Sequence, residues 1–378
     1  MKRKKRVKLR RVKRVKKQKH PFDRNFFYLV LSLVVVGLVF VADISAPQAL
    51  TYFDDKFHFL KQQVVAAVVG VIAMIVISGI KYSYWKKIAV PFFGFSIILL
   101  IAVLIPGISY SALGARRWIS VGGFNFQPSE VVKLSLALYL AKVSEMNKKT
   151  ISYFVPLGIV AGLIMLQPDL GTTIIVATIG VAQIFVAGVP LLHFLGTVAV
   201  GIVGVVGLIL SSSYRRDRLI TFLQNTTDPL GKSYHIRQIL LAMGSGGIFG
   251  VGLGQSKQKY LFLPEASTDS IFAAIAEEIG LIGGLAIILV FLYFVFKAFK
   301  IAVNAPDKFS KVLAVGITSW IGGQALLNFS SMVALTPLTG IPLPFFSFGG
   351  TSLVMVLVGC GILLNISRYE TKKITSRR

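Results

Sequence analysis

The sequence has very little cysteine and little charge for its length. Cys360 is the only cysteine among 378 residues and lies in an apolar run, which excludes a disulfide framework or a cysteine metal site within the chain. Charged residues make up 15% of the chain and hydrophobic residues 54%, and the mean hydropathy is +0.74. A composition this apolar excludes a soluble domain of this length and indicates a polytopic membrane protein.

Acidic residues are also scarce, which leaves a formal net charge of +26 with much of the excess in residues 1–24. In a soluble protein such a charge would suggest nucleic-acid binding. This segment has almost no aromatic residues for base stacking, however, and an apolar run follows at once. We therefore expect no nucleic-acid partner and interpret residues 1–24 as a cytoplasmic tail that contacts anionic membrane lipids.

Apolar windows separated by charged or Pro/Gly-rich breaks predict ten membrane spans. They lie near residues 26–43, 59–80, 88–106, 128–144, 152–167, 171–189, 193–212, 270–298, 310–335 and 350–367. The first run lacks a small-residue cleavage site, so we interpret it as a retained span. The predicted fold is an all-α polytopic membrane protein with one ten-helix domain over residues 25–368, between the basic tail and a second tail at 369–378.

Basic residues in the short loops predict the orientation of the spans. Most lie on the side of the basic N-terminus, in loops that contain Lys81, Lys86, Lys87, Lys142, Lys148, Lys149, Lys297, Lys300, Lys308 and Lys311. This predicts cytoplasmic N- and C-termini and a large extracytoplasmic loop, residues 213–269, between spans seven and eight. Two basic clusters lie on the opposite side, at 116–117 and 214–259. They suggest an anionic ligand there, although long translocated loops also ignore charge.

The first cluster belongs to a glycine-flanked motif at residues 114–133. Arg116 and Arg117 lie in a short loop and can bind phosphate oxygens in a bidentate fork. Glu130 and Lys133 follow in the next span, where their i, i+3 spacing lets them pair. We favour a structural ion pair for these two residues over a catalytic role.

The motif QPDLGT, residues 167–172, joins the fifth and sixth spans. Asp169 follows a proline and precedes a glycine, so we expect the chain to turn there and the carboxylate to cap the next helix. A metal or substrate contact is the alternative for this residue.

The loop at 213–269 contains an apolar segment, Ile239 to Leu253, that is too short and glycine-rich to span as an ordinary helix. We expect an amphipathic or re-entrant element at the outer interface. Arg237, Lys257 and Lys259 flank it as cations. A later segment, residues 337–352, has three prolines and three glycines, so it predicts irregular backbone that lines a cavity. Polar groups offered to that cavity are Asn328, Ser347, Thr351 and Ser352. Of these, Ser347 and Ser352 are candidate substrate contacts and Asn328 is a candidate supporting residue.

Three carboxylates lie in the stretch from Tyr260 to Gly284, where the loop enters the eighth span. Carboxylates at membrane depth are costly and indicate function or pairing. On an ideal helix Asp269 lies nearest the water-facing entrance, and Glu277 and Glu278 lie about two turns deeper in a packing or polar-network role. One helical face would carry a stripe of small residues, namely Ala273, Ala276, Gly280 and Gly283.

Several of these motifs together resemble the SEDS family (shape, elongation, division and sporulation). They are GARRWI with QPSE and Lys133, QPDLGT, GSGGIFGVGLGQSKQK, LPEASTD with EEIG, and TGIPLPFFSFGG, in this order within residues 26–367. The motif GLGQSKQKYLFLPEA resembles the division-type FtsW branch more than the RodA branch. Departures from the common pattern are Ser267 for histidine, Ser270 for phenylalanine, Ala276 for glycine and Phe348 for tyrosine.

The resemblance implies ten helices and polymerisation of peptidoglycan glycan strands from lipid II at the outer face of the bacterial cytoplasmic membrane. It also implies a class B penicillin-binding protein as partner. The essential aspartate of the family corresponds to Asp269, its intramembrane pair to Glu130 and Lys133, and its basic loop position to Lys257.

From this reading we expect Asp269 to act as the general base in an inverting glycosyl transfer, because a diphosphate leaving group needs no general acid. The growing glycan strand would be the donor. The candidate diphosphate ligands are Arg116, Arg117, Arg237, Lys257 and Lys259, with a divalent cation (Mg²⁺ or Mn²⁺) as a candidate cofactor. A flippase for a lipid-linked precursor and a non-enzymatic scaffold are the alternatives.

Overall fold

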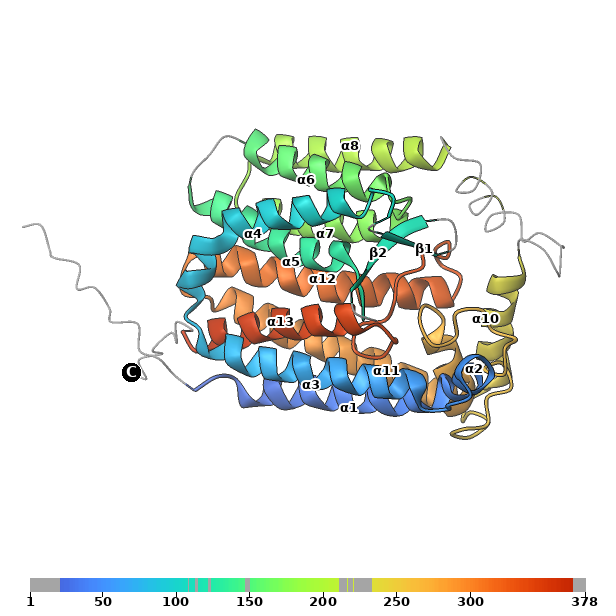
Figure 1. Ribbon diagram of the computed structural model, residues 1–378. Helices are drawn as coiled ribbons and strands as arrows, with labels where there is room; N and C mark the ends of the chain where they lie inside the picture. Colours follow the sequence, from blue (N-terminus) through green and yellow to red (C-terminus); the bar gives the residue numbers. More distant parts are fainter. Residues whose placement is uncertain are drawn as a thin grey trace, which may run out of the picture.

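The computed structural model describes residues 21–107, 109–112, 115–121, 124–146, 150–210, 216, 220 and 233–369. Within them the chain is a bundle of roughly parallel and antiparallel apolar helices, with a small sheet and two short helices, α2 (Ala46–Phe53) and α10 (Tyr234–Ser245), toward one end (Figure 1). Most of the basic tail, the tail after Tyr369 and much of the loop at 213–269 lie outside the described residues, as do Gly114, Lys148 and Lys149.

Each of the ten predicted apolar segments contains a helix. These are α1 (Arg24–Ile44), α3 (His58–Gly79), α4 (Tyr82–Ala102), α5 (Pro128–Glu145), α6 (Ile151–Met165), α7 (Leu170–Val186), α8 (Leu191–Leu210), α11 (Ile271–Val303), α12 (Lys308–Met332) and α13 (Gly350–Ser367). In the described part of the chain, six are long and apolar enough to cross a membrane, namely α1, α3, α4, α11, α12 and α13. The helical multi-pass architecture is therefore present, and the count of ten spans stays a prediction.

The expectation of an all-α fold is wrong at residues 109–126. Strands β1 (Ser109–Ala112), β2 (Ala115–Val121) and β3 (Phe124–Phe126) form an antiparallel sheet in the order β1-β2-β3. The described residues of the segment predicted as a short loop thus form three paired strands, whose backbone groups bond to one another. The sheet connects the end of α4 to the start of α5.

Helix α12 packs against α5, α7, α11 and α13 and supplies the centre of the core, where Trp320 is fully buried. It begins with a capping box, in which the Asp307 carboxylate accepts a hydrogen bond from the Ser310 N–H and the Ser310 hydroxyl accepts one from the Asp307 N–H. Two buried amides, Gln324 and Asn328, lie one turn apart on this helix. They face the irregular chain between α12 and α13.

Helix α11 is broken at Gly280, whose φ of 69° and ψ of −171° are not helical. The carbonyls of Glu277 and Glu278 accept from the N–H groups of Val251 and Gly252, at 3.0 Å each. On the far side of the break, Leu281 and Ile282 donate to the carbonyls of Gly247 and Ile248. The backbone of 247–252 thereby satisfies the polar groups that the break frees.

This insertion depends on glycine on both sides. A Cβ at Gly280 would lie 2.3 Å from the Gly250 nitrogen, and one at Gly250 would lie 2.1 Å from the Glu278 carbonyl oxygen. The predicted small-residue stripe is therefore not continuous, because the helix changes direction within it. Gly280 allows the loop at residues 247–252 to approach closely, whereas the predicted stripe would have allowed another helix to approach.

Candidate functional site

Asp269 lies half-buried just before α11, whose N-cap is Ser270. Three successive carbonyls hold this stretch in place. Ser267 accepts from the Phe348 N–H at 2.9 Å, Thr268 accepts from the Ser347 hydroxyl at 2.6 Å, and Asp269 accepts from the Asn328 amide at 2.8 Å. The backbone of the carboxylate-bearing turn is therefore fixed by α12 and by the chain that follows it.

The chain between Met332 and Gly350 forms no helix or strand, as its prolines and glycines predict. Gly340 has a φ of +70°, and a Cβ on it would lie 3.2 Å from Asp269 Oδ2, so the carboxylate lies directly beside a residue without a side chain. The segment is held by Asn328, which also donates to the Ile341 carbonyl, and by Ser347, which accepts from the Leu343 N–H.

Two of the residues predicted to offer polar groups to a cavity bind backbone, which agrees with the supporting role predicted for Asn328. The Asn328 amide bridges Asp269 and Ile341, and the buried Ser347 hydroxyl bridges Thr268 and Leu343. This geometry favours a positioning role for Ser347 over the predicted substrate contact. Ser352 lies half-buried in the first turn of α13, and Thr351 beside it donates to the Asn125 carbonyl.

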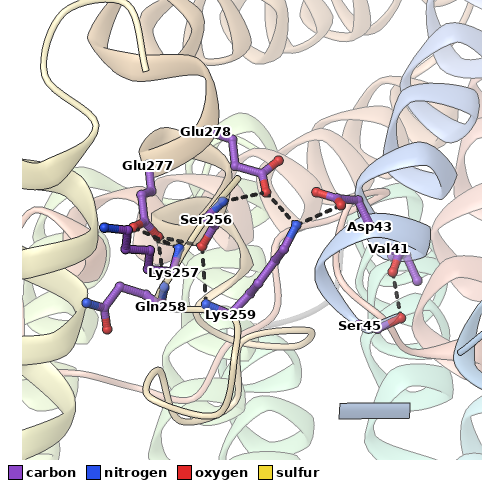
Figure 2. Close-up of polar contacts among 9 residues, drawn as sticks. All are labelled: Val41, Asp43, Ser45, Ser256, Lys257, Gln258, Lys259, Glu277 and Glu278. Atoms are coloured by element: carbon purple, nitrogen blue, oxygen red, sulfur yellow. Dashed lines mark hydrogen bonds and ion pairs between the residues drawn. The ribbon is translucent and has the colours of Figure 1, made fainter. Parts of the chain in front are cut away.

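Deeper in α11, the two glutamates contribute to a group that we call the carboxylate node: Asp43, Ser256, Lys259, Glu277 and Glu278 (Figure 2). Glu277 accepts from the Ser256 hydroxyl at 2.5 Å, and further from the backbone N–H groups of Lys257 and Gln258 and from the Ser245 hydroxyl. These donors satisfy the hydrogen-bonding capacity of the buried Glu277 carboxylate.

Glu278 and Asp43 share the ammonium of Lys259, at 2.8 and 2.7 Å from its Nζ (Figure 2). Only 3% of the Lys259 side chain is exposed. Burial lowers the pKa of Lys259, but its hydrogen bonds to the two carboxylates outweigh this and raise the pKa above its usual value. Lys259 was predicted to hold a diphosphate. Its buried, doubly paired ammonium instead ties the loop to α1 and α11.

A second buried ion pair lies at the start of α5. Lys133 donates to Glu130 at 2.7 Å, which is the pairing that the i, i+3 spacing predicts, and also to the Gln324 side-chain oxygen at 3.1 Å. The ammonium lies 5.2 Å from the centre of the Trp320 ring. Gln324 in turn donates to the Pro342 carbonyl, so this pair connects through α12 to the chain beside Asp269.

The sheet is fixed to the turn between α6 and α7. Arg117 donates to the carbonyls of Gln167 and Pro168, and its Nε lies 4.0 Å from Asp169. Asp169 is the N-cap of α7 and accepts from the Thr172 N–H, which is the capping geometry that the motif predicts. Arg117 therefore binds protein carbonyls where a phosphate contact was predicted, whereas Arg116 beside it is exposed.

Among the predicted anion ligands, Arg116, Arg237 and Lys257 have exposed side chains. In the described part of the chain no group of three or more His, Cys, Asp and Glu side chains could hold a metal ion. The sequence did not indicate that Asp43 and Ser256 belong to the carboxylate node or that Gln324 binds Lys133. It also did not indicate that His235 is hydrogen-bonded to Ser270, the residue after Asp269. Asp43 is 216 residues from Lys259, so no local pattern signals their contact.

Comparisons with known proteins match the chain almost throughout. The profile of the family described as "Cell cycle protein" (FTSW_RODA_SPOVE) matches residues 23–372. Stage V sporulation protein E of Bacillus subtilis (strain 168) is 44% identical and aligns over 92% of this chain and 97% of its own length. A protein named probable peptidoglycan glycosyltransferase FtsW from Trichlorobacter lovleyi is 41% identical, over 92% of this chain and 93% of its own.

A solved structure, described as "Structural coordination of polymerization and crosslinking by a peptidoglycan synthase complex", contains a chain with the same fold. It superposes with a TM-score of 0.76 at 27% identity and covers 92% of this chain and 98% of that one. Fold, motif order and sequence identity agree over nearly the whole length, and the chain therefore belongs to the FtsW/RodA/SpoVE family.

Proposed function

We propose that the chain is a peptidoglycan glycosyltransferase that polymerises glycan strands from lipid II, with Asp269 as the general base. The observation that carries this proposal is the placement of one half-buried carboxylate at the mouth of α11, on a turn whose three carbonyls are fixed by α12 and the segment before α13. The names of the relatives, which include probable peptidoglycan glycosyltransferases, support the reaction class.

The chemistry requires little more than a base and cations. The 4-hydroxyl oxygen of the incoming lipid II attacks the anomeric carbon of the growing strand and forms the new glycosidic bond with inversion. The bond from that carbon to the diphosphate breaks, and the diphosphate leaves with the electron pair. The hydroxyl proton passes to the Asp269 carboxylate, which supplies the base that such a transfer needs.

Arg116, Arg237 and Lys257 are the proposed diphosphate ligands, because their side chains are exposed and cationic. Arg117 and Lys259 position the sheet and the loop through protein contacts instead. A divalent cation, Mg²⁺ or Mn²⁺, is the proposed cofactor, and bound beside the diphosphate it would neutralise charge on the leaving group. The described residues offer no group of three or more His, Cys, Asp and Glu side chains to hold it.

The proposed setting is the bacterial cytoplasmic membrane, crossed ten times, with both termini in the cytoplasm and the Asp269 entrance on the outer face. Among the residues that the structure describes, six helices are long and apolar enough to cross a membrane, which supports a multi-pass protein. A class B penicillin-binding protein is the proposed partner. Support comes from the similar chain in a structure described as a synthase complex that coordinates polymerization and crosslinking.

The test uses purified protein with its partner and labelled lipid II, with the products resolved on a gel. Asp269→Ala and Asp269→Asn should form no polymer while melting at the wild-type temperature in detergent. Glu265→Gln is the matched control, because Glu265 is an exposed carboxylate four residues earlier, and it should keep polymerising. Full-length glycan from either Asp269 variant would overturn the assignment of the base.

A lipid-linked precursor flippase is the second candidate, because a broken helix with buried charges also occurs in transporters. Vesicles that contain the protein and labelled lipid II separate the two functions. Polymer without accelerated movement between leaflets supports the transferase, and movement without polymer supports the flippase.

A further inference from the structure

The first turn of α10 contacts both ends of the segment that carries Asp269. The Tyr234 hydroxyl donates to the Phe262 carbonyl at 2.9 Å, and the His235 Nε2 is hydrogen-bonded to the Ser270 hydroxyl at 2.8 Å. We call the stretch between these two contacts, residues 262–270, the mouth segment. Helix α10 therefore contacts the mouth segment at both of its ends.

Ser270 is the residue through which this bridge reaches α11. It is fully buried and is the N-cap of the helix, yet its hydroxyl makes no capping bond to the helix backbone. The hydroxyl is bonded to His235 instead, while the Ser270 carbonyl accepts from Ala273 and Ala274 and so begins the helix. Any contact that fixes Ser270 therefore also fixes the residue bonded to its nitrogen, which is Asp269.

Three further contacts to this turn come from a different part of the chain. Phe348, Ser347 and Asn328 hold the carbonyls of residues 267–269. His235 is the described side chain that holds the next residue, and it belongs to the loop between α8 and α11. The Ser270 side chain is therefore held from α10, whereas the carbonyls of residues 267–269 are held from α12 and the segment before α13.

We propose that His235 is a positioning residue for the reaction: through the Ser270 hydroxyl it sets the orientation of the Asp269 carboxylate. This inference rests on the proposed function, in which Asp269 is the base. A base must be held within hydrogen-bond reach of the proton that it takes, and small displacements reduce turnover strongly. His235 acts on the geometry of the base and makes no contact with substrate in this role.

The decisive experiment measures two quantities for the same set of variants in complex with the partner. One is the initial rate of polymerisation over a range of lipid II concentrations, and the other is amide hydrogen exchange in peptides that cover residues 262–275. The variants are His235→Leu, His235→Gln, Ser270→Ala and the double variant His235→Leu/Ser270→Ala. His58→Leu is the control, since it makes the same substitution at the start of α3.

We expect His235→Leu and Ser270→Ala each to lower kcat about tenfold with KM unchanged. The double variant should be no slower than His235→Leu alone, because that variant has already lost the contact with Ser270. His235→Gln keeps a side-chain hydrogen-bonding group and should recover most of the lost rate. Exchange in residues 262–275 should rise in His235→Leu and stay at the wild-type level in His58→Leu.

Additive losses in the double variant, or a normal kcat in His235→Leu, would overturn the proposal. Faster exchange with normal kcat would show that the contact holds the mouth segment without governing the reaction. The exchange measurement does not depend on activity, so it remains informative if Asp269→Asn proves active and the proposed function fails. If His235→Leu does not fold, the rates of Ser270→Ala and His235→Gln decide the question.

Discussion

The two ends of the first half of α11 hold their carboxylates in opposite ways. At the break, Glu277 and Glu278 are buried, and donors from the loop, including the Lys259 ammonium, bind both carboxylates. At the mouth, Asp269 is half-buried, and its turn is positioned through backbone carbonyls. A buried charge is tolerated only when it is paired, so the node is committed to the fold. The fold therefore fixes the node through its side chains and the Asp269 turn through its backbone carbonyls.

The largest expected effect is on folding, from Lys259→Met. This change leaves Glu278 and Asp43 without their shared cation and should lower the stability by about 3–5 kcal/mol. Thermal melting in detergent and the yield of folded protein measure it. Lys257→Met on the same loop is the control, because Lys257 is exposed, and it should melt near the wild-type temperature.

The assignment of the node to stability and of Asp269 to catalysis would be contradicted if Lys259→Met melted at the wild-type temperature but lost polymerisation. In that case the node would belong to the reaction. Adding Glu278→Gln to Lys259→Met should recover part of the stability, because the double variant buries one charge fewer.

The next largest effect is expected from Gly280→Ala, which tests whether the break itself is required. The Gly280 conformation is essentially restricted to glycine, and its Cβ would overlap the Gly250 nitrogen, so we expect a loss of about 3 kcal/mol. Gly158→Ala in α6 is the matched control, since a Cβ there meets no atom within 4 Å. A stable Gly280→Ala protein with a straight α11 would contradict the insertion of residues 247–252.

A smaller effect is expected from Gln324→Leu, which cuts the connection between the ion pair of α5 and the chain beside Asp269. Lys133 loses one acceptor and the Pro342 carbonyl loses its donor, so the stability should fall by about 1–3 kcal/mol. Polymerisation should fall more than melting alone explains, because the Gly340 region shifts. Gln62→Leu on the exposed face of α3 is the control, and equal rates for the two variants would contradict this prediction.

The smallest effect is expected at the exposed pair of Asp55 and Lys61. A hydrogen bond from Lys61, together with one from the Phe57 N–H, lowers the pKa of Asp55 below its usual value of 3.8. A carboxyl group whose pKa is lower in the folded protein than in the unfolded chain stabilises the fold at pH values above its unfolded-state pKa. This stabilisation is lost as the pH falls through the folded-state pKa. Asp55→Asn should therefore leave melting at pH 7 almost unchanged and remove only a slight dependence below about pH 4. A large change in the melting temperature of Asp55→Asn at pH 7 would contradict the prediction. It would show that this solvent-accessible pair stabilises the fold as strongly as the buried carboxylate node does.

Local patterns predicted the parts of the structure that local forces determine. Long apolar runs located the helices, the i, i+3 spacing predicted the pair of Glu130 and Lys133, and the turn residues around Asp169 predicted its cap. The same approach placed Asp269 just before a helix, where the structure also has it. Its catalytic role stays a prediction until it is measured.

Contacts between distant segments could not be predicted in this way. Lys259 resembled the exposed cations around it, and only the fold brings it to Asp43 in α1. Gly280 fitted a stripe for helix packing, because an apolar sequence does not distinguish an approaching helix from an approaching loop. The sheet at 109–126 was missed since its strands are short and separated by glycines.

The break at Gly280 also gives α11 a pivot. The nine residues from Ile271 to Ile279 form a rigid arm, and the mouth segment lies at its tip, roughly 15 Å from the pivot. A tilt of about 10° would move the tip by roughly 2.5 Å, which is comparable to the length of a hydrogen bond. The four backbone hydrogen bonds to residues 247–252 oppose that tilt. Any movement of the loop at one end of the arm would therefore displace the carboxylate at the other.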